Sequence, residues 1–382
     1  MNESLNNKLN NRDVPKRILS LDGGGIRGIL TLGMLKKIEQ MVLSRPDFKG
    51  KVLGEYYDMV CGTSTGAIIA CGLAKGMTVQ QIIDLYLGLG KEIFGKGRKC
   101  KILKRKWTKL RAFLNENYSS DNLEKYLQKV FGDTTLGNAD DILCGVVINS
   151  KRADTYSLWT LGNHPEAKYF DCNNHLGLWE LCRASSAAPY YFKPKKLKTY
   201  TRERKEIIAA FIDGGVSLSN NPAWTSFLVS VVPTFGFKWN TGADKLFITT
   251  LGTGNGQLKE DPDKMIKMNA LAWAPKLSDL FMVDALENNQ VILDLLGLNA
   301  GSKFASDGQF VDLDKLGLID NKLFTFQRHN IKLNKEEINN KLGFTYTDAQ
   351  IKDFSEMDHY ENMNDLLKIG EKYAEQNIAS IL

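Results

Sequence analysis

Residues 62–66 read Gly-Thr-Ser-Thr-Gly, a G-x-S-x-G motif between a strand-like and a helix-like segment. This context is what a nucleophile elbow requires, because Gly62 and Gly66 relieve crowding around a strained turn. The turn presents the hydroxyl of Ser64 at a helix N-terminus, where it can attack an electrophile. A tight turn of small residues without chemistry is the structural alternative. The motif in this context predicts Ser64 as a nucleophile.

A serine nucleophile needs a base, and the chain has four histidines. His329 and His359 come late enough for the usual order of a serine triad, but neither has glycine or small neighbours typical of a catalytic turn. Asp213 follows an apolar segment and precedes Gly214, so we expect its carboxylate at the carboxyl end of a strand, where sites of parallel sheets gather. Burial would raise its proton affinity toward that of a base. An ordinary Asp-Gly turn is the alternative.

The segment ILSLDGGGIRGIL, residues 18–30, fits two kinds of anion site. Gly23, Gly25 and Gly28 satisfy the dinucleotide-binding pattern G-x-G-x-x-G. The backbone N–H groups of Gly23, Gly24 and Gly25 could instead stabilise an oxyanion at the start of a helix. Dinucleotide binding requires an acidic residue at the end of a second strand about 20 residues further on, and that window is polar and interrupted by proline. The oxyanion hole is therefore the favoured interpretation.

Together the three motifs resemble those of the patatin-like phospholipases, whose signatures are Asp-Gly-Gly-Gly-x-Arg-Gly, Gly-x-Ser-x-Gly and Asp-Gly-Gly or Asp-Gly-Ala. They stand here, in the same order, at Asp22–Gly28, Gly62–Gly66 and Asp213–Gly215. The segments ASSAAPYYF, SLSNNPAW and TTLGTG are also similar to blocks of this family, so the resemblance covers about residues 16–256. It implies that Arg27 orients the glycine loop, with a lipid head-group contact as the alternative.

The resemblance implies a Ser–Asp dyad that works without histidine. Ser64 would attack an acyl ester carbonyl, and Asp213 would accept its proton. The N–H groups of Gly24 and Gly25, with Gly23 as a third candidate, would stabilise the oxyanion. Water would then release the fatty acid from the acyl-enzyme, with no metal and no other cofactor.

The resemblance also implies a substrate, namely a phospholipid cleaved by phospholipase A or lysophospholipase chemistry. Galactolipids and other non-phospholipid esters are alternatives. A catalytically silent lipid- or nucleotide-binding module on the same fold is a further alternative, which the presence of both Ser64 and Asp213 disfavours. Bacterial members of similar length include phospholipases that cyclic nucleotides switch on in phage defence. We therefore expect a small-molecule activator of that class, in a regulated membrane-degrading effector, whereas the sequence does not set the oligomeric state.

Positive charge is concentrated in residues 96–111, which hold nine Lys or Arg and no acid, within a chain of net charge +6. Lys104, Arg105, Lys106 and Trp107 could contact anionic lipid head groups. A solvated loop or a nucleic-acid contact are the alternatives; the family resemblance favours a phospholipid membrane, and no nucleic acid is expected. The chain shows no apolar run of about 18 residues, and its polar, Asn-rich N-terminal segment lacks the apolar core expected of a signal peptide. We expect a cytoplasmic protein, peripheral at the inner membrane surface, with reduced cysteines and no zinc site.

Strand-like and helix-like segments alternate through the first 255 residues, and these elements must bring the three motifs to one edge of a sheet. We predict a patatin-like three-layer α/β/α fold with a mainly parallel central sheet over residues 16–256. Residues 1–15 are expected to be a disordered lead-in, and residues 257–382 a mostly helical part packed on the same domain. The predicted strands include residues 17–22, 56–64, 141–150, 206–215, 245–254 and 322–331.

Overall fold

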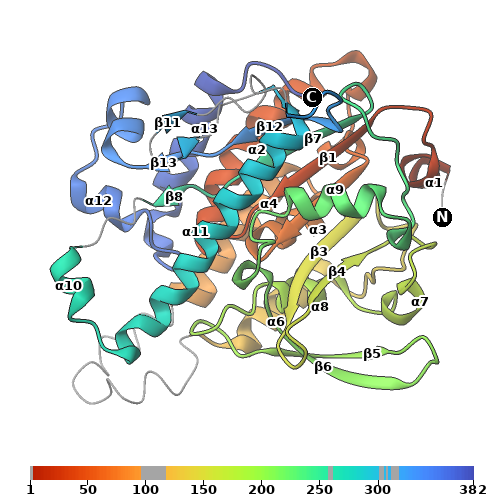
Figure 1. Ribbon diagram of the computed structural model, residues 1–382, viewed down its shortest axis with the longest axis horizontal. Helices are drawn as coiled ribbons and strands as arrows, with labels where there is room; N and C mark the ends of the chain where they lie inside the picture. The colour runs from red at the N-terminus through yellow and green to blue at the C-terminus, as the bar shows by residue number, and fades with distance from the viewer. Residues whose placement is uncertain (1–2, 96–117, 257–260, 301–304, 307–308, 311–317) are drawn as a thin grey trace.

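The computed structural model describes residues 3–95, 118–256, 261–300, 305–306, 309–310 and 318–382. Within them, a nine-stranded sheet has the order β5-β6-β3-β2-β1-β7-β12-β9, with β4 also paired to β3 (Figure 1). Its strands are β1 (Lys16–Leu21), β2 (Met59–Thr63), β3 (Gly145–Arg152), β4 (Leu158–Gly162), β5 (Lys195–Tyr200), β6 (Glu206–Asp213), β7 (Leu246–Leu251), β9 (Gly297–Asn299) and β12 (Phe324–His329). Short pairs outside it are β8 (Asn255–Gly256) with β13 (Lys332–Leu333), and β10 (Ala305–Ser306) with β11 (Gln309–Phe310).

Helices cover both faces of this sheet. They are α1 (Glu3–Asn10), α2 (Gly28–Leu43), α3 (Thr65–Ala74), α4 (Val79–Leu89), α6 (Ser120–Phe131), α7 (Phe170–Asn173), α8 (Leu178–Ser185), α9 (Ala223–Val231), α10 (Pro262–Ile266), α11 (Ala270–Leu296), α12 (Asp348–Asp353) and α13 (Met363–Asn377). In Figure 1, α9 and α11 lie in front of the sheet.

The apolar core is divided between the two faces, as alternation along the strands requires. On β1, Leu19 and Leu21 belong to one cluster with α2, α3, α4 and α13, whereas Ile18 belongs to a second cluster with α1 and α9. The six strands β3, β2, β1, β7, β12 and β9 run parallel, and β4, β5 and β6 are antiparallel to their partners. The predicted α/β/α class with a mainly parallel sheet is confirmed.

The expectation of a disordered lead-in over residues 1–15 is wrong for the described part of that segment. Its residues form α1, in which Leu5 and Leu9 are buried. The two leucines stand four residues apart and therefore share one face of the helix. The Lys8 ammonium group donates to two backbone carbonyls at 2.9 and 3.0 Å, which fixes the helix against the domain. An Asn-rich composition concealed a small amphipathic pattern.

The part of the chain beyond residue 256 packs on the same domain, and it also contributes two strands to the central sheet. β12 pairs in parallel with β7 on one side and with β9 on the other. Helix α13 packs against α2, and a Cβ atom added to Gly33 would lie only 2.6 Å from the carbonyl oxygen of Leu367. The sheet that carries the motifs therefore includes strands from both parts of the chain.

Two further expectations concern membranes and thiols. Of the helices in the described ranges, not one combines the length and apolar character that a membrane span requires. Five cysteines in the described residues are buried free thiols. The sixth, Cys100, and the basic residues Lys104, Arg105, Lys106 and Trp107 lie outside the described residues.

Candidate active site

Ser64 and Asp213 meet because β2 and β6 lie end to end along one edge of β3. The parallel pairing of β2 ends at Thr63 opposite Asn149, and the antiparallel pairing of β6 begins with Asp213 opposite Ser150. β4 pairs with the same stretch of β3 and so occupies its other edge. Asp213 ends β6, but β6 is antiparallel to β3. Its last residue therefore lies at the carboxyl edge of the parallel strands, although β6 approaches that edge from the opposite direction.

Ser64 has the backbone geometry of a strained elbow. Its φ of 54° and ψ of −119° lie where residues with a Cβ atom are seldom found, and it caps the N-terminus of α3. Its N–H group donates to Ser185 Oγ at 2.8 Å. A Cβ atom on Gly62 would lie 2.2 Å from the Gly66 carbonyl oxygen, and one on Gly66 would lie 2.1 Å from the carbonyl oxygen at the end of β1. Both glycines of the motif are therefore required by close backbone approach.

The Ser64 hydroxyl donates to Asp213 Oδ2 at 2.7 Å. The other carboxylate oxygen, Oδ1, accepts from the Gly215 N–H at 2.6 Å. Asp213 is only 4% exposed, and its burial raises the pKa to about 6 against the opposing effect of these two hydrogen bonds. A Cβ atom on Gly214 would lie 2.5 Å from the Asn149 carbonyl oxygen, so this turn too depends on glycine.

The two late histidines are placed elsewhere. His359 Nδ1 bonds to Asp353 Oδ1 at 2.5 Å. His329 is buried on β12, where burial lowers its pKa to about 4. The partner that the structure gives the Ser64 hydroxyl is the Asp213 carboxylate.

Two glycines of the loop lie beside Ser64 at the cavity. Gly24 and Gly25 line this cavity, and the structure pairs neither of their N–H groups with an acceptor in the described residues. The Gly23 N–H is engaged by the Asn220 carbonyl at 3.0 Å. The expectation of Gly23 as a third donor is therefore wrong, because its amide is already used to hold the loop. Gly25 has φ +61°, a conformation that favours glycine.

Arg27 lies behind the loop and not in the cavity. Its side chain donates to the Gly24 carbonyl at 3.4 Å and to the Ser355 carbonyl at 3.3 Å. The adjacent Ile26 N–H donates to the Met357 carbonyl at 3.0 Å. These contacts tie the glycine loop to the C-terminal part of the chain.

The cavity beside the dyad has a volume of about 100 Å³ and is mainly apolar. Two oxygens in its wall, Ser186 Oγ and Asn220 Oδ1, are buried without a hydrogen-bond partner in the described residues. A Cβ atom on Gly23 would lie 2.4 Å from Asn220 Oδ1 and 3.3 Å from the Ser64 Cβ atom, which places the amide of Asn220 close to Ser64. The apolar lining of the cavity comprises Ile26, Ile68, Tyr86, Leu89, Phe94, Leu123, Ala188, Pro189, Tyr191, Phe192, Val216, Met282, Met357 and Met363.

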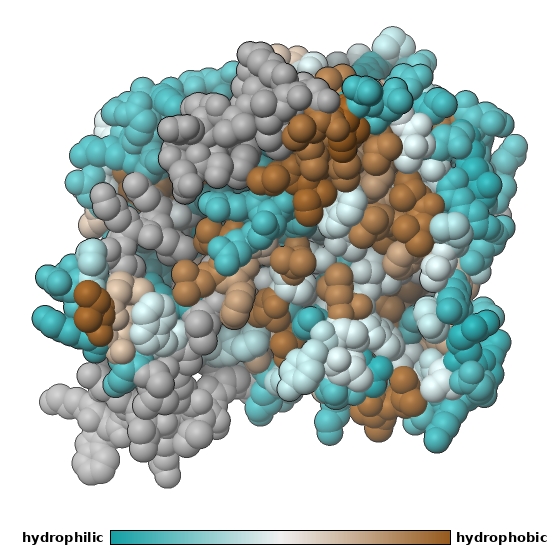
Figure 2. Space-filling view, viewed as in Figure 1, coloured by the Kyte–Doolittle hydropathy of each residue, from teal (hydrophilic) through white to brown (hydrophobic). Residues whose placement is uncertain are grey.

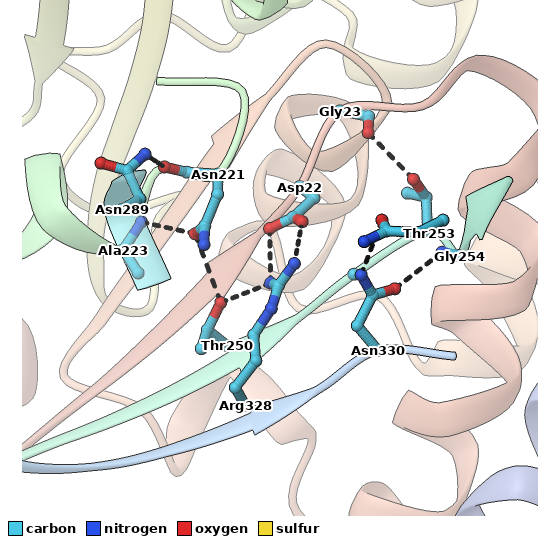
Figure 3. Close-up of polar contacts among 12 residues, drawn as sticks. Asp22, Gly23, Asn221, Ala223, Thr250, Thr253, Gly254, Asn289, Arg328 and Asn330 are labelled. Carbon is cyan, nitrogen blue, oxygen red and sulfur yellow. Dashed lines mark hydrogen bonds and ion pairs between the residues drawn. The ribbon is translucent and has the colours of Figure 1, made fainter. Parts of the chain in front are cut away.

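An ion pair beneath the glycine loop was not found from the sequence. Arg328 on β12 forms two parallel hydrogen bonds with Asp22, the residue that precedes the glycines (Figure 3). Both side chains are buried. The only available signal was an arginine within an apolar strand, and its partner lies 306 residues away.

The sequence model of the family described as patatin-like phospholipase matches residues 19–226, more than half of the chain. The chain belongs to the patatin-like phospholipase family. Like its relatives, it is an enzyme that hydrolyses carboxylic esters.

Three similar proteins illustrate the breadth of the family. A cGAMP-activated phospholipase of Vibrio cholerae serotype O1 is 26% identical over 304 residues, which cover 78% of this chain and 81% of that protein. A cGAMP-activated phospholipase of Escherichia coli is 27% identical over 264 residues, or 67% of each chain. Patatin-2-Kuras 4 of Solanum tuberosum is 26% identical over 251 residues, or 62% of each.

Among solved structures, human GIVD cytosolic phospholipase A2 aligns with 98% of this chain and 61% of its own, with a TM-score of 0.45 and 10% identity. VipD from Legionella pneumophila aligns with 93% of this chain and 67% of its own, with a TM-score of 0.33 and 14% identity.

Proposed function

We propose that this enzyme releases fatty acid from phospholipids through an acyl-enzyme on Ser64, with Asp213 as the base. The observation that carries the proposal is the 2.7 Å hydrogen bond from the Ser64 hydroxyl to the Asp213 carboxylate at the wall of an apolar cavity. A carboxylate with a pKa of about 6 is a better proton acceptor than an exposed aspartate. The reacting groups are already within hydrogen-bond distance, so their orientation is set before substrate binds.

In the acylation step, Ser64 Oγ bonds to the ester carbonyl carbon while its proton passes to Asp213 Oδ2. The carbonyl oxygen becomes an oxyanion, toward which the N–H groups of Gly24 and Gly25 donate. When the ester C–O bond breaks, the leaving alkoxide takes the proton from Asp213. The products of this step are the alcohol part of the lipid and an acyl ester on Ser64.

In the deacylation step, water attacks the acyl-enzyme and gives one proton to Asp213. The same oxyanion donors act again, and Asp213 returns the proton to Ser64 as the fatty acid leaves. Ser186 Oγ and Asn220 Oδ1, buried in the cavity wall, are available to accept a hydrogen bond from the second hydrogen of that water. A water molecule with such partners would be held in a defined position for attack.

Hydrolysis of lipid panels with defined acyl positions, followed by mass spectrometry, tests the substrate class. We expect fatty-acid release from phospholipid by the native enzyme and none by Ser64→Ala. Release from galactolipids or simple esters alone would contradict the phospholipid assignment while leaving the dyad intact. Equal release by the native enzyme and Ser64→Ala would contradict the dyad itself.

We also propose peripheral contact with a phospholipid membrane. Apolar side chains gather toward the middle of the face that α9 and α11 cover, with hydrophilic ones around its rim (Figure 2). On α11, Leu280 is 49% and Phe281 63% exposed, and the next residue, Met282, lines the cavity. Exposed apolar residues next to one that lines the cavity are suited to contact with a bilayer.

The membrane proposal predicts that Phe281→Asp lowers hydrolysis of anionic phospholipid vesicles and leaves hydrolysis of a soluble short-chain ester unchanged. Ile208→Asp is the matched control, because Ile208 is 66% exposed on the separate β5–β6 pair. Equal loss on vesicles in both variants would contradict a specific contact through α11. Neutralising Lys104, Arg105 and Lys106 tests the basic segment in the same vesicle assay.

A cyclic dinucleotide is proposed as an activator. Two relatives, one of which covers 78% of this chain, are named cGAMP-activated phospholipases. Such control suits an effector in bacterial defence, because unregulated lipid hydrolysis would damage the cell that makes it. We expect cGAMP or another cyclic dinucleotide to raise fatty-acid release by the native enzyme and not by Ser64→Ala. Unchanged release across a panel of cyclic dinucleotides would contradict this regulation.

A further inference from the structure

Arg328 joins three neighbouring strands beneath the glycine loop. Its Nη1 donates to Asp22 Oδ1 at 2.8 Å and its Nη2 to Asp22 Oδ2 at 2.5 Å (Figure 3). Nη1 also donates to Thr250 Oγ1 at 2.8 Å. Asp22 immediately follows β1, Thr250 lies on β7, and Arg328 lies opposite Thr250 on β12. One guanidinium therefore fixes the carboxyl end of β1 relative to two strands.

Further hydrogen bonds connect these residues to the glycine loop and to the loop that holds Asn220 and Asn221. Thr250 Oγ1 donates to Asn221 Oδ1 at 3.4 Å. Asn220, the preceding residue, accepts the Gly23 N–H through its carbonyl oxygen at 3.0 Å. Thr253 Oγ1 donates to the Gly23 carbonyl at 2.9 Å. The glycine loop is thus held from below by Asp22 and from each side through Gly23.

The Asp22 carboxylate is compatible with an oxyanion at the glycine loop only while Arg328 is paired with it. Asp22 is 2% and Arg328 8% exposed, so neither charge is screened by solvent. An unpaired carboxylate one residue before the glycines would repel the negative charge that develops on the substrate carbonyl oxygen. The Arg328 guanidinium neutralises it, and a bidentate pair also fixes the orientation of the carboxylate plane.

We propose that Arg328 is a positioning residue for the oxyanion hole. It acts through Asp22 to direct the N–H groups of Gly24 and Gly25 toward the reacting carbonyl oxygen. This inference rests on the proposed acyl-enzyme mechanism. Arg328 lies outside residues 19–226, the segment that the family model matches, so a residue beyond that segment completes the site.

The test measures kcat and KM of the full chain on a short-chain ester for Arg328→Met, with the melting temperature as a check of folding. We expect kcat to fall about 10²-fold with little change in KM, comparable to loss of one oxyanion donor. Arg328→Lys keeps the charge but loses the paired geometry, so we expect a loss of about tenfold. Asp22→Asn combined with Arg328→Met removes both charges, and we expect it to recover about tenfold over Arg328→Met alone.

Lys16→Met is the matched control, because Lys16 is also buried and forms an ion pair with Asp58 at 3.2 Å, at the opposite end of β1. We expect it to lower the melting temperature and leave kcat unchanged. Folded Arg328→Met or Arg328→Lys with native kcat would overturn the proposal, as would an equal loss of kcat in Lys16→Met.

Ser64→Ala separates the role of Arg328 from the acyl-enzyme mechanism on which it rests. Ester hydrolysis that persists in this variant would refute the acyl-enzyme mechanism, whereas activity lost there but retained in both Arg328 variants would refute only the role of Arg328.

Discussion

Ser64 and Asp213 both stand where a strand ends, but the two turns are destabilised in different ways. Ser64 follows β2 with φ 54° and ψ −119°, whereas Asp213 ends β6 with φ −51° and ψ 134°, an unstrained conformation. The unfavourable feature of Asp213 is instead electrostatic, since burial raises its pKa to about 6. Ser64 is presented at the expense of backbone strain, and the proton affinity of Asp213 is raised at the expense of desolvation.

If the two turns act as one unit, either single substitution should remove most of the activity. We expect Ser64→Ala and Asp213→Asn each to lower kcat by about 10⁴-fold or more, as is typical when one member of a nucleophile–base unit is lost. The measurement is steady-state fatty-acid release. A double variant no slower than either single one would support joint action, whereas multiplicative losses would indicate that the residues work independently.

The oxyanion loop should show a smaller effect than the dyad. Gly25→Ala introduces a Cβ atom 2.3 Å from the Met357 carbonyl oxygen in a loop with φ +61°. We expect kcat to fall by about 10²–10³-fold, the effect of losing one oxyanion donor. Gly132→Ala is the matched control, because Gly132 has φ +59° with open space around the added atom. Similar loss of kcat in both variants would show that backbone strain alone explains the effect.

The pH dependence of activity should follow the Asp213 carboxylate. Only its ionised form accepts the Ser64 proton, and its pKa is raised by burial to about 6. We therefore expect kcat/KM to rise about tenfold per pH unit below pH 6 and to level off above it. The measurement is a profile from pH 4 to 8 on an uncharged ester, with folding checked at each pH. A flat profile across that range would contradict Asp213 as the base.

The desolvation of Asp213 should also appear in stability. Its folded pKa of about 6 lies above its ordinary value of 3.8, so between these values the unfolded chain ionises first and stability falls as pH rises. The loss is complete above pH 6 and amounts to about 3 kcal/mol. We expect Asp213→Asn to raise the free energy of unfolding by up to about 3 kcal/mol at pH 8, and by much less at pH 4. Urea denaturation at both values measures this, and a pH-independent difference would contradict desolvation as the cause.

The strain at Ser64 should give the smallest effect. Ser64→Ala and Ser64→Gly both remove the hydroxyl, but only glycine adopts φ 54° and ψ −119° without a Cβ penalty. We expect Ser64→Gly to be more stable than Ser64→Ala by about 1–2 kcal/mol in urea denaturation at pH 7. Equal stability of the two variants would mean that the elbow is not strained.

The meeting of Ser64 and Asp213 could be predicted from the sequence because each residue carries a local signal. G-x-S-x-G and Asp-Gly-Gly both mark strand ends with tight turns, although the two side chains lie 149 residues apart. The direction of β6 could not be predicted, because a strand pattern is the same for parallel and antiparallel pairing. The use of the Gly23 N–H also depends on where the Asn220 carbonyl lies in space, which no local pattern encodes.

Arg328 and α1 show a second limit of prediction from sequence, namely contacts that depend on the folded domain. The bond between Arg328 and Asp22 forms only after β1, β7 and β12 are aligned, so the sequence gives no local sign of it. For α1, the two buried leucines were too few to stand out in a polar segment, and their contacts depend on the completed domain. Contacts of this kind are therefore harder to predict than the meeting of Ser64 and Asp213.

The most direct test of the acyl-enzyme mechanism is labelling with a fluorophosphonate, located by peptide mass spectrometry. We expect a single label on Ser64 in the native enzyme, lost in Ser64→Ala and greatly slowed in Asp213→Asn while the chain remains folded. A label on another residue, or unchanged labelling in Asp213→Asn, would contradict a Ser64–Asp213 dyad.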